Sequence, residues 1–182
     1  MPEPSPLPWY ALRLRSNHEQ NASRLLQDKG FTTLVPLYRI RRKWSDRTKE
    51  IEVPLFRGYI FCQLDVIHQL PILTTPGVVS ILGSSEGPVP IDEAEMAAVR
   101  TLVHSGLPVG PWPFVQKGQP VVVERGPLQG AEGIVVELKD RYQLVVSISL
   151  LQRSVWVQID RECVRPLAQQ KAHPLSRSVG GT

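Results

Sequence analysis

The chain of 182 residues is long enough for one ordinary domain or two small ones. Its hydrophobic content of 42% and charged content of 21% are typical of a folded, water-soluble protein, and no apolar run approaches the roughly 20 residues that a membrane helix needs. The net charge of +4 and the pI of about 9.3 favour an anionic partner such as a nucleic acid.

The N-terminal residues and the cysteines indicate the compartment. Residues 1–8 are proline-rich and lack the basic and apolar segments of a secretory signal, which favours the cytoplasm. The two cysteines, Cys62 and Cys163, lie far apart in strand-like runs, where a reduced cysteine behaves as a small buried hydrophobe. We therefore expect no disulfide and no association with a membrane.

The first segment, residues 8–105, begins with a strand pattern followed by a helix pattern. Alternation over Trp9–Leu14 predicts a strand. Ser16, with Glu19 three residues later, predicts a capping box that opens a helix, and Gly30 suits the end of that helix.

The remainder of this segment mixes strands with a second helix. In chain order the patterns predict a strand through Leu34, a hairpin over Tyr38–Val53 with its turn near Ser45, and strands over Tyr59–Leu64 and Val78–Leu82. A helix that Asp92 caps follows, because apolar residues recur there at helical spacing: Met96, Val99, Leu102 and Val103. A mixture of this kind predicts an α+β fold.

Residues 106–115 contain too many prolines and glycines for a helix or a central strand. We interpret them as a linker between two domains. Residues 168–182 are small and polar and have no periodicity, which predicts a disordered tail.

The second segment, residues 116–167, has no helical period. Its five candidate strands are Val121–Val123, Gly133–Leu138, Tyr142–Ile148, Ser154–Ile159 and Cys163–Arg165. Alternating apolar residues in Tyr142–Ile148 and Ser154–Ile159 would be buried together in a small closed barrel, so we expect an all-β, SH3-like barrel.

A turn in this segment connects it to a known family. Arg125–Gly130 places two glycines around Pro127, and a Gly-Pro turn of this kind is by itself a common hairpin device. The strand and loop over Leu144–Val155 follow at a fixed spacing. Together these stretches resemble the KOW domain of NusG-like transcription factors, with Gln152 where the family carries a glycine.

The first segment resembles the NusG N-terminal domain, the NGN domain. Trp9-Tyr10 and Pro54–Phe61 are similar to its hallmark strands, and Thr75–Val79 and Pro90-Ile91 are similar to its later half. The resemblance covers Pro8–Leu167 and implies a ferredoxin-like NGN domain with an antiparallel sheet and helices, followed by a KOW barrel. Ile67-His68 and the basic hairpin are closer to specialised RfaH-like paralogues.

The resemblance implies a transcription elongation and antitermination factor. Such a factor binds RNA polymerase through its NGN domain, bridges the cleft to increase processivity, and recruits partners through its KOW domain. KOW domains also occur in ribosomal proteins, so the alternative is a KOW-containing RNA-binding or ribosome-associated protein.

The family lays an apolar face of the NGN domain on the clamp helices of the largest polymerase subunit. By resemblance, this RNA polymerase-binding face comprises Tyr10, Phe56, Tyr59 and Phe61, and we expect Phe56 to be the most exposed of them. The alternative is that these strand aromatics form the core. His68 occupies the position from which the paralogues contact the second-largest subunit, and an exposed loop histidine is the alternative.

The hairpin is strongly basic. Its cations are accompanied by one aromatic residue; the set is Arg39, Arg41, Arg42, Lys43, Trp44, Arg47 and Lys49. Cations interleaved with an aromatic residue are typical of binding to single-stranded nucleic acid, although a charge run can also be a solvated surface. We expect contact with DNA in the elongation complex.

In the KOW barrel, Leu128 and Leu151 occupy positions that the family presents to partners, either a small-subunit ribosomal protein or Rho. Packing at the edge of the core is the alternative for both residues. The four histidines are scattered, and no metal-ligand spacing or nucleophile motif is present. We expect a monomer that is not an enzyme and that binds no metal or cofactor.

Overall fold

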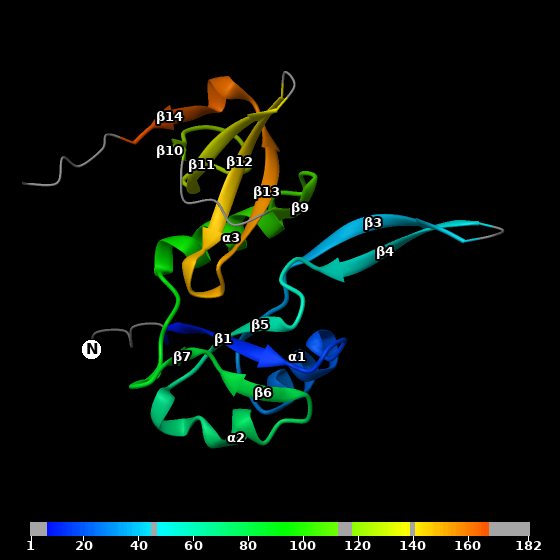
Figure 1. The fold of residues 1–182 in the computed structure, drawn as a ribbon, viewed down its shortest axis with the longest axis vertical. Coiled ribbons are helices and arrows are strands. Elements are labelled where there is room, and N and C mark those ends of the chain that lie inside the picture. Colours follow the sequence, from blue (N-terminus) through cyan, green and yellow to red (C-terminus); the bar gives the residue numbers. More distant parts are fainter. Residues whose placement is uncertain (1–6, 45–46, 113–117, 139–140, 168–182) are drawn as a thin grey trace, which may run out of the picture.

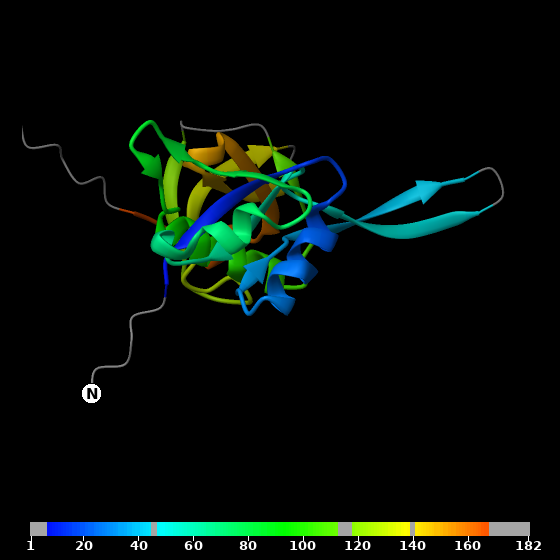
Figure 2. The same cartoon turned by 90° about the horizontal axis from the view of Figure 1, so that it is seen from below.

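The computed structural model describes residues 7–44, 47–112, 118–138 and 141–167. It contains a small N-terminal sheet, an arm that extends away from the rest of the chain, and a larger C-terminal sheet (Figures 1 and 2). The predicted turn near Ser45 and the predicted tail over 168–182 lie outside the described residues.

The N-terminal sheet has the strand order β2-β5-β1-β6, and all neighbouring strands are antiparallel. Its strands are β1 (Trp9–Leu14), β2 (Thr33–Leu34), β5 (Tyr59–Gln63) and β6 (Val78–Ile81), which confirms the strands predicted there. Tyr10 lies opposite Cys62, and Ala11 lies opposite Phe61. Because side chains alternate along a strand, these two pairs point to opposite faces of the sheet.

Helices α1 (Glu19–Asp28) and α2 (Leu70–Leu73) cover one face of this sheet. We call it the helix-covered face; its buried residues are Tyr10, Leu12, Leu14, Ile60, Cys62 and Leu64. Ala22 and Leu26 of α1 are fully buried against it, as their spacing of four residues on a helix allows.

The predicted capping box at the start of α1 is wrong. His18 is the N-cap residue, and no side chain caps the helix. The Glu19 carboxylate is buried and instead accepts a hydrogen bond from the Gly58 N–H at 2.8 Å, which joins α1 to the loop before β5. Gly30 follows the helix with a φ of +88°, as predicted for its end.

The arm consists of β3 (Leu37–Lys43) and β4 (Thr48–Pro54), which pair only with each other. It projects from the side of the molecule (Figure 2). The predicted hairpin is therefore confirmed. Two short strands, β7 (Gly83–Ser84) and β8 (Gly87–Pro88), form a second small hairpin, and a single turn of 3-10 helix, η1 (Val66–His68), precedes α2.

The C-terminal sheet has the order β14-β10-β11-β12-β13-β9. Five of its strands fall where the sequence predicted them: β10 (Gln119–Val123), β11 (Glu132–Leu138), β12 (Arg141–Ile148), β13 (Arg153–Ile159) and β14 (Val164–Pro166). The 3-10 turns η2 (Ser149–Leu151) and η3 (Arg161–Cys163) lie between strands. The predicted α+β class with an all-β C-terminal part is confirmed.

The remaining strand, β9 (Val109–Trp112), corrects the linker predicted over 106–115. It pairs with β13 at the edge of the sheet, where proline is tolerated because one side of the strand has no pairing partner. Gly110 lies opposite Trp156, and a Cβ atom added at Gly110 would lie 2.6 Å from the indole Nε1. Glycine therefore permits the close approach of the two strands.

Helix α3 (Glu93–His104) connects the two sheets. Asp92 caps it as predicted, because its side chain accepts hydrogen bonds from the N–H groups of Ala94 and Glu95 at 2.9 and 3.1 Å. The buried face of α3 contains Met96, Val99 and Leu102, and the helix packs on β11 and β12. No described helix is long and apolar enough to cross a membrane.

Candidate functional site

The N-terminal sheet has a second apolar face, opposite α1 and α2. We call it the covered face; it comprises Trp9, Ala11 and Phe61 from the sheet and Leu55 and Phe56 from the segment before β5. Each of these side chains is at most 5% exposed. The Phe56 and Phe61 rings meet edge to face, with centroids 5.3 Å apart and an interplanar angle of 79°.

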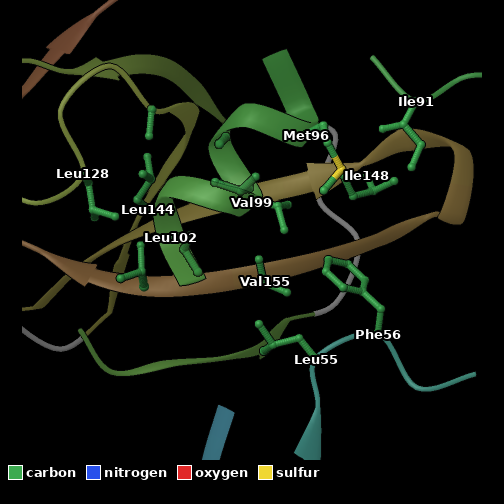
Figure 3. Close-up of a cluster of buried hydrophobic side chains, with 14 of the residues drawn as sticks. Leu55, Phe56, Ile91, Met96, Val99, Leu102, Leu128, Leu144, Ile148 and Val155 are labelled. Carbon is green, nitrogen blue, oxygen red and sulfur yellow. The ribbon is translucent and has the colours of Figure 1, made fainter. Parts of the chain in front are cut away.

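The covered face is buried by a part of the chain that is distant in sequence. It belongs to one hydrophobic cluster with α3 and the C-terminal sheet, including Met96, Ile148 and Val155 (Figure 3). Helices α1 and α2, in contrast, contribute to the other cluster only. The C-terminal sheet and α3 thus form the cover of this face.

One cationic side chain ties the cover to the rim of the face. The Arg153 guanidinium on β13 donates to the Arg57 carbonyl at 2.8 Å and lies 4.9 Å from the centre of the Tyr59 ring. This distance is short enough for a cation–π interaction. Arg153 therefore contacts the loop and the first residue of β5, both adjacent to Phe56.

A second polar contact joins α3 to η2. The Ser149 N–H donates to both carboxylate oxygens of Glu95, at 3.2 and 3.1 Å, and the Ser149 hydroxyl donates to one of them at 2.6 Å. Hydrogen bonds to a charged acceptor are stronger than neutral ones. This contact fixes the position of α3 on the C-terminal sheet.

The structure unites only part of the predicted polymerase-binding set. Phe56, Tyr59 and Phe61 lie together, with Tyr59 half-buried beneath Arg153. The expectation that Phe56 is the most exposed is wrong in this conformation, because Phe56 is 1% exposed. Tyr10 lies on the helix-covered face and does not join the others.

Sequence reasoning missed Trp9. It alternates with Tyr10 and therefore shares a face with Ala11 and Phe61, which is the signal that could have identified it. Its indole Nε1 is buried without a hydrogen-bond acceptor among the described residues, and the Arg100 guanidinium lies 6.0 Å from its ring. The cover therefore leaves one donor on the covered face unsatisfied.

His68 lies apart from the covered face, on η1 beside α2. Its side chain is exposed, and its Nδ1 lies 3.1 Å from the Asp65 carboxylate. The N–H of Ile67 and then the His68 side chain hold the pKa of Asp65 below its usual value. This hydrogen bonding gives His68 a defined position on the surface.

The seven predicted nucleic-acid residues all lie on the arm or at its end, but two of them have acidic partners. Arg39 and Arg41 pair across the strands with Glu52 and Glu50, at 3.4 and 3.1 Å. Trp44 is exposed by 57%. The remaining cations are Arg42, Lys43, Arg47 and Lys49, and the described residues offer none of them an ion-pair partner.

The predicted partner residues of the C-terminal sheet are part of its core. Leu128 is 1% and Leu151 is 9% exposed, so both belong to the cluster that contains the cover. Their packing follows the core alternative, and the expectation that they present themselves to a partner is wrong in this conformation. Gly126 and Gly130 have φ angles of +90° and +83°, as the turn around Leu128 requires.

Gln152 adopts the conformation that a glycine would favour. Its φ of +51° and ψ of +44° are left-handed, and its side chain donates to the Ser149 carbonyl at 2.9 Å. Gln152 therefore occupies a backbone region that glycine enters without strain. The described residues contain no group of three or more histidine, cysteine or acidic side chains that could hold a metal ion.

Known proteins resemble the chain over most of its length. A family model described as transcription termination factor nusG matches residues 7–100. Transcription termination/antitermination protein NusG is 24% identical over 166 residues in Helicobacter pylori (83% of this chain, 93% of that protein) and 27% identical over 163 residues in Campylobacter jejuni (83% and 92%). The solved structure "Domain interaction in Thermotoga maritima NusG" aligns at a TM-score of 0.54 and 19% identity, covering 88% of this chain and 97% of that one.

Proposed function

The chain belongs to the NusG family of transcription factors, and from this premise we propose that it binds RNA polymerase through the covered face and promotes processive elongation. The observation that supports this role is the composition of that face. Trp9, Phe56 and Phe61 form an aromatic surface, and aromatic residues dominate the energetics of protein interfaces.

The site has a second property that favours an external partner. The cover comes largely from residues beyond 100, whereas the helix-covered face is buried by helices that lie between its own strands in sequence. A surface of this kind can change its partner without loss of the N-terminal sheet. We infer that the clamp helices of the largest polymerase subunit replace the C-terminal sheet on the covered face.

Because of this exchange, release of the C-terminal sheet from the covered face becomes part of the binding equilibrium. If only the open form binds polymerase, the apparent Kd is the intrinsic Kd divided by the open fraction. Each 1.4 kcal/mol that favours the covered form therefore weakens polymerase binding by about tenfold. The Trp9 N–H, which is buried with no acceptor among the described residues, reduces the stability of the covered form and so favours exchange.

The proposed action on polymerase is mechanical. A factor bound across the cleft, with His68 toward the second-largest subunit and the arm toward DNA, would hold the clamp closed and so disfavour pausing. It shifts the population toward the closed clamp only by the difference between its affinities for the two states. A preference of about 1.4 kcal/mol would reduce the open fraction about tenfold.

The C-terminal sheet, once released, is proposed to act as a KOW-type recruitment domain. Its partner would be a small-subunit ribosomal protein or Rho. Because Leu128 and Leu151 are buried, we assign the contact to neither residue.

Binding to purified core polymerase tests the proposal. Phe56→Ala should weaken binding by about 30-fold, the effect of removing an interface residue worth about 2 kcal/mol. Trp44→Ala is the control, because Trp44 is also aromatic but lies at the end of the arm, and it should leave core binding unchanged. Both variants should retain cooperative thermal unfolding. Phe56 also packs against the cover, so its loss raises the open fraction, and the 30-fold loss refers to the open form. Equal affinity of Phe56→Ala and the unaltered chain, after correction for the open fraction of each, would exclude the covered face as the polymerase site.

A further inference from the structure

The arm has two chemically different faces. Residues directly opposite each other in an antiparallel pair share a face, and consecutive pairs alternate between faces. One face, the ion-paired face, carries the pairs Leu37–Pro54, Arg39–Glu52, Arg41–Glu50 and Lys43–Thr48. The opposite face, the cationic face, carries the pairs Tyr38–Val53, Ile40–Ile51 and Arg42–Lys49.

The end of the arm continues the cationic face. The Trp44 N–H donates to the Arg47 carbonyl at 2.8 Å, so these two residues also lie opposite each other. They follow the Arg42–Lys49 pair by two positions on each strand. The cationic face therefore carries Arg42, Lys49, Arg47 and an exposed tryptophan, and among the described residues it carries no acidic side chain.

The charges on the two faces are balanced differently. On the ion-paired face, Glu52 and Glu50 neutralise Arg39 and Arg41. On the cationic face, Arg42 lies directly opposite Lys49, and like charges in this position destabilise a strand pair. The arm thus concentrates positive charge on one side at a cost in its own stability.

Apolar side chains accompany these cations. The Ile40–Ile51 pair is half-buried and directly precedes the Arg42–Lys49 pair on the same face. Such cross-strand pairs help a two-stranded ribbon to remain folded. Their position also puts apolar side chains on both sides of the Arg42–Lys49 pair, with Ile40 and Ile51 before it and Trp44 after it. Binding of phosphates alone does not require these apolar side chains, whereas the apolar faces of unpaired bases can pack against them.

We propose that the cationic face of the arm binds single-stranded nucleic acid and that the ion-paired face does not. Arg42, Arg47 and Lys49 hold phosphates, and a base stacks on Trp44. The inference rests on the proposed function, since it names which side of the arm meets nucleic acid. Four residue steps from Ile40 to Trp44 span about 13 Å, or about four stacked nucleotides.

Binding of the full-length chain to a fluorescent 12-mer of deoxythymidine, measured by anisotropy at several KCl concentrations, tests this inference. Arg42→Gln with Lys49→Gln removes two phosphate contacts and should lower the log-log salt slope by about 1.4, which corresponds to about 25-fold weaker binding at 0.1 M salt. Arg39→Gln with Arg41→Gln is the matched control, because it removes the same net charge from the other face. The control should retain the slope.

Trp44→Ala tests the stacking contact. It should weaken binding by about fivefold without changing the salt slope, because stacking releases no counterions. A 12-mer of uridine should bind like the DNA strand, and a duplex of mixed sequence should bind more weakly. Thermal unfolding of each variant confirms that the arm substitutions leave both sheets folded.

Three results would overturn the inference. The first is an equal loss of affinity in the two charge-matched double variants. The second is no measurable binding of the 12-mer at 0.02 M salt, where the Debye length is about 20 Å and charges are weakly screened, and the third is tighter binding to duplex that Trp44→Ala does not affect. None of these results bears on the covered face. Phe56→Ala, which lies outside the arm, should bind the 12-mer like the unaltered chain, so the two proposals fail independently.

Discussion

The two faces of the N-terminal sheet are buried in different ways. Helices α1 and α2 cover one face, and they are interleaved in sequence with the strands that they cover. The C-terminal sheet and α3 cover the other face. Both faces are inaccessible to solvent, since Leu12 on one and Phe61 on the other are fully buried. Burial alone therefore does not distinguish a permanent core from an interaction surface.

The contacts around the two covers show the difference. On the helix-covered face, the buried Glu19 carboxylate and Lys29 join the helices to the loops around them; Lys29 donates to the Pro71 carbonyl and to Thr75. On the covered face, Arg153 makes its contacts at the rim, and the indole N–H of Trp9 has no acceptor among the described residues. Helices α1 and α2 complete the fold of the N-terminal sheet, whereas the C-terminal sheet and α3 leave a polar group of the covered face without a hydrogen bond among the described residues.

The largest expected effect is on the helix-covered face. Leu26→Ala removes a fully buried side chain from α1 and should lower the free energy of unfolding by about 2–5 kcal/mol. Urea denaturation followed by circular dichroism measures this loss. A loss below about 1 kcal/mol would mean that α1 is not a fixed part of the N-terminal unit.

A smaller effect is expected at the rim of the covered face. Arg153→Ala removes the hydrogen bond to Arg57 and the contact with Tyr59, which together stabilise the covered form by about 1 kcal/mol at this exposed position. The open fraction, and with it the affinity for core polymerase, should rise about fivefold.

Arg165→Ala provides the matched control for this prediction. Arg165 is likewise an arginine with a polar partner, here the Glu124 carboxylate, but it lies on β14 at the far edge of the C-terminal sheet. It should leave polymerase affinity unchanged. Weaker polymerase binding by Arg153→Ala would instead identify Arg153 as a polymerase contact.

The pKa of Cys62 provides a probe of the helix-covered face. Burial raises the pKa of this thiol to about 12 from 9.0, so it stays protonated where the unfolded chain ionises. The free energy of unfolding that the protonated thiol contributes is complete below pH 9 and is lost as pH rises toward 12. From pH 9 to pH 10 the loss is about 1 kcal/mol.

The difference between the unaltered chain and Cys62→Ala isolates this contribution from other groups that titrate in alkali. At pH 8, a thiol reagent should label the half-buried Cys163 and not Cys62. Labelling of Cys62 at the rate of Cys163 would show that the helix-covered face opens as readily as the surface of the C-terminal sheet.

The smallest effect concerns the cover itself. Gln152→Gly should raise the stability of the C-terminal sheet by a few tenths of a kcal/mol, because relief of the left-handed strain slightly exceeds the loss of the exposed hydrogen bond to Ser149 together with the entropy that glycine adds to the unfolded chain. Gln152→Ala, which keeps the strain and loses the hydrogen bond to Ser149, should lower stability. Thermal unfolding distinguishes the two, and a lower midpoint for Gln152→Gly would contradict this account.

Local patterns predicted most of the fold. Alternation in the C-terminal strands, the Asp92 cap and the basic hairpin each depend on residues close in sequence, and all are present. The cap of α1 failed because Glu19 found a distant partner, the Gly58 N–H, which no local pattern contains. Strand β9 was not predicted, because its prolines and glycines are acceptable only at the edge of a sheet, and the edge position depends on pairing with β13.

The site was less predictable than the fold. Apolar runs show that Phe56 and Phe61 are buried, but the identity of their cover depends on contacts between distant segments, such as Arg57 with Arg153, which are 96 residues apart. The faces of the arm depend on register. The alternation of side chains along a strand is enough to predict that Arg41 and Arg42 lie on opposite faces. The pairing of Arg41 with Glu50 depends in addition on the geometry of the turn, which sets the register.

In the proposed mechanism, the C-terminal sheet leaves the covered face before polymerase binds. A chemical lock tests it most directly: Arg57→Cys with Arg153→Cys, in a Cys163→Ser background, places two thiols across the rim, and a short bis-maleimide joins them. The cross-linked chain should lose binding to core polymerase, while the same chain treated with a monofunctional maleimide should bind. Equal binding by the cross-linked and the singly modified chains would contradict the claim.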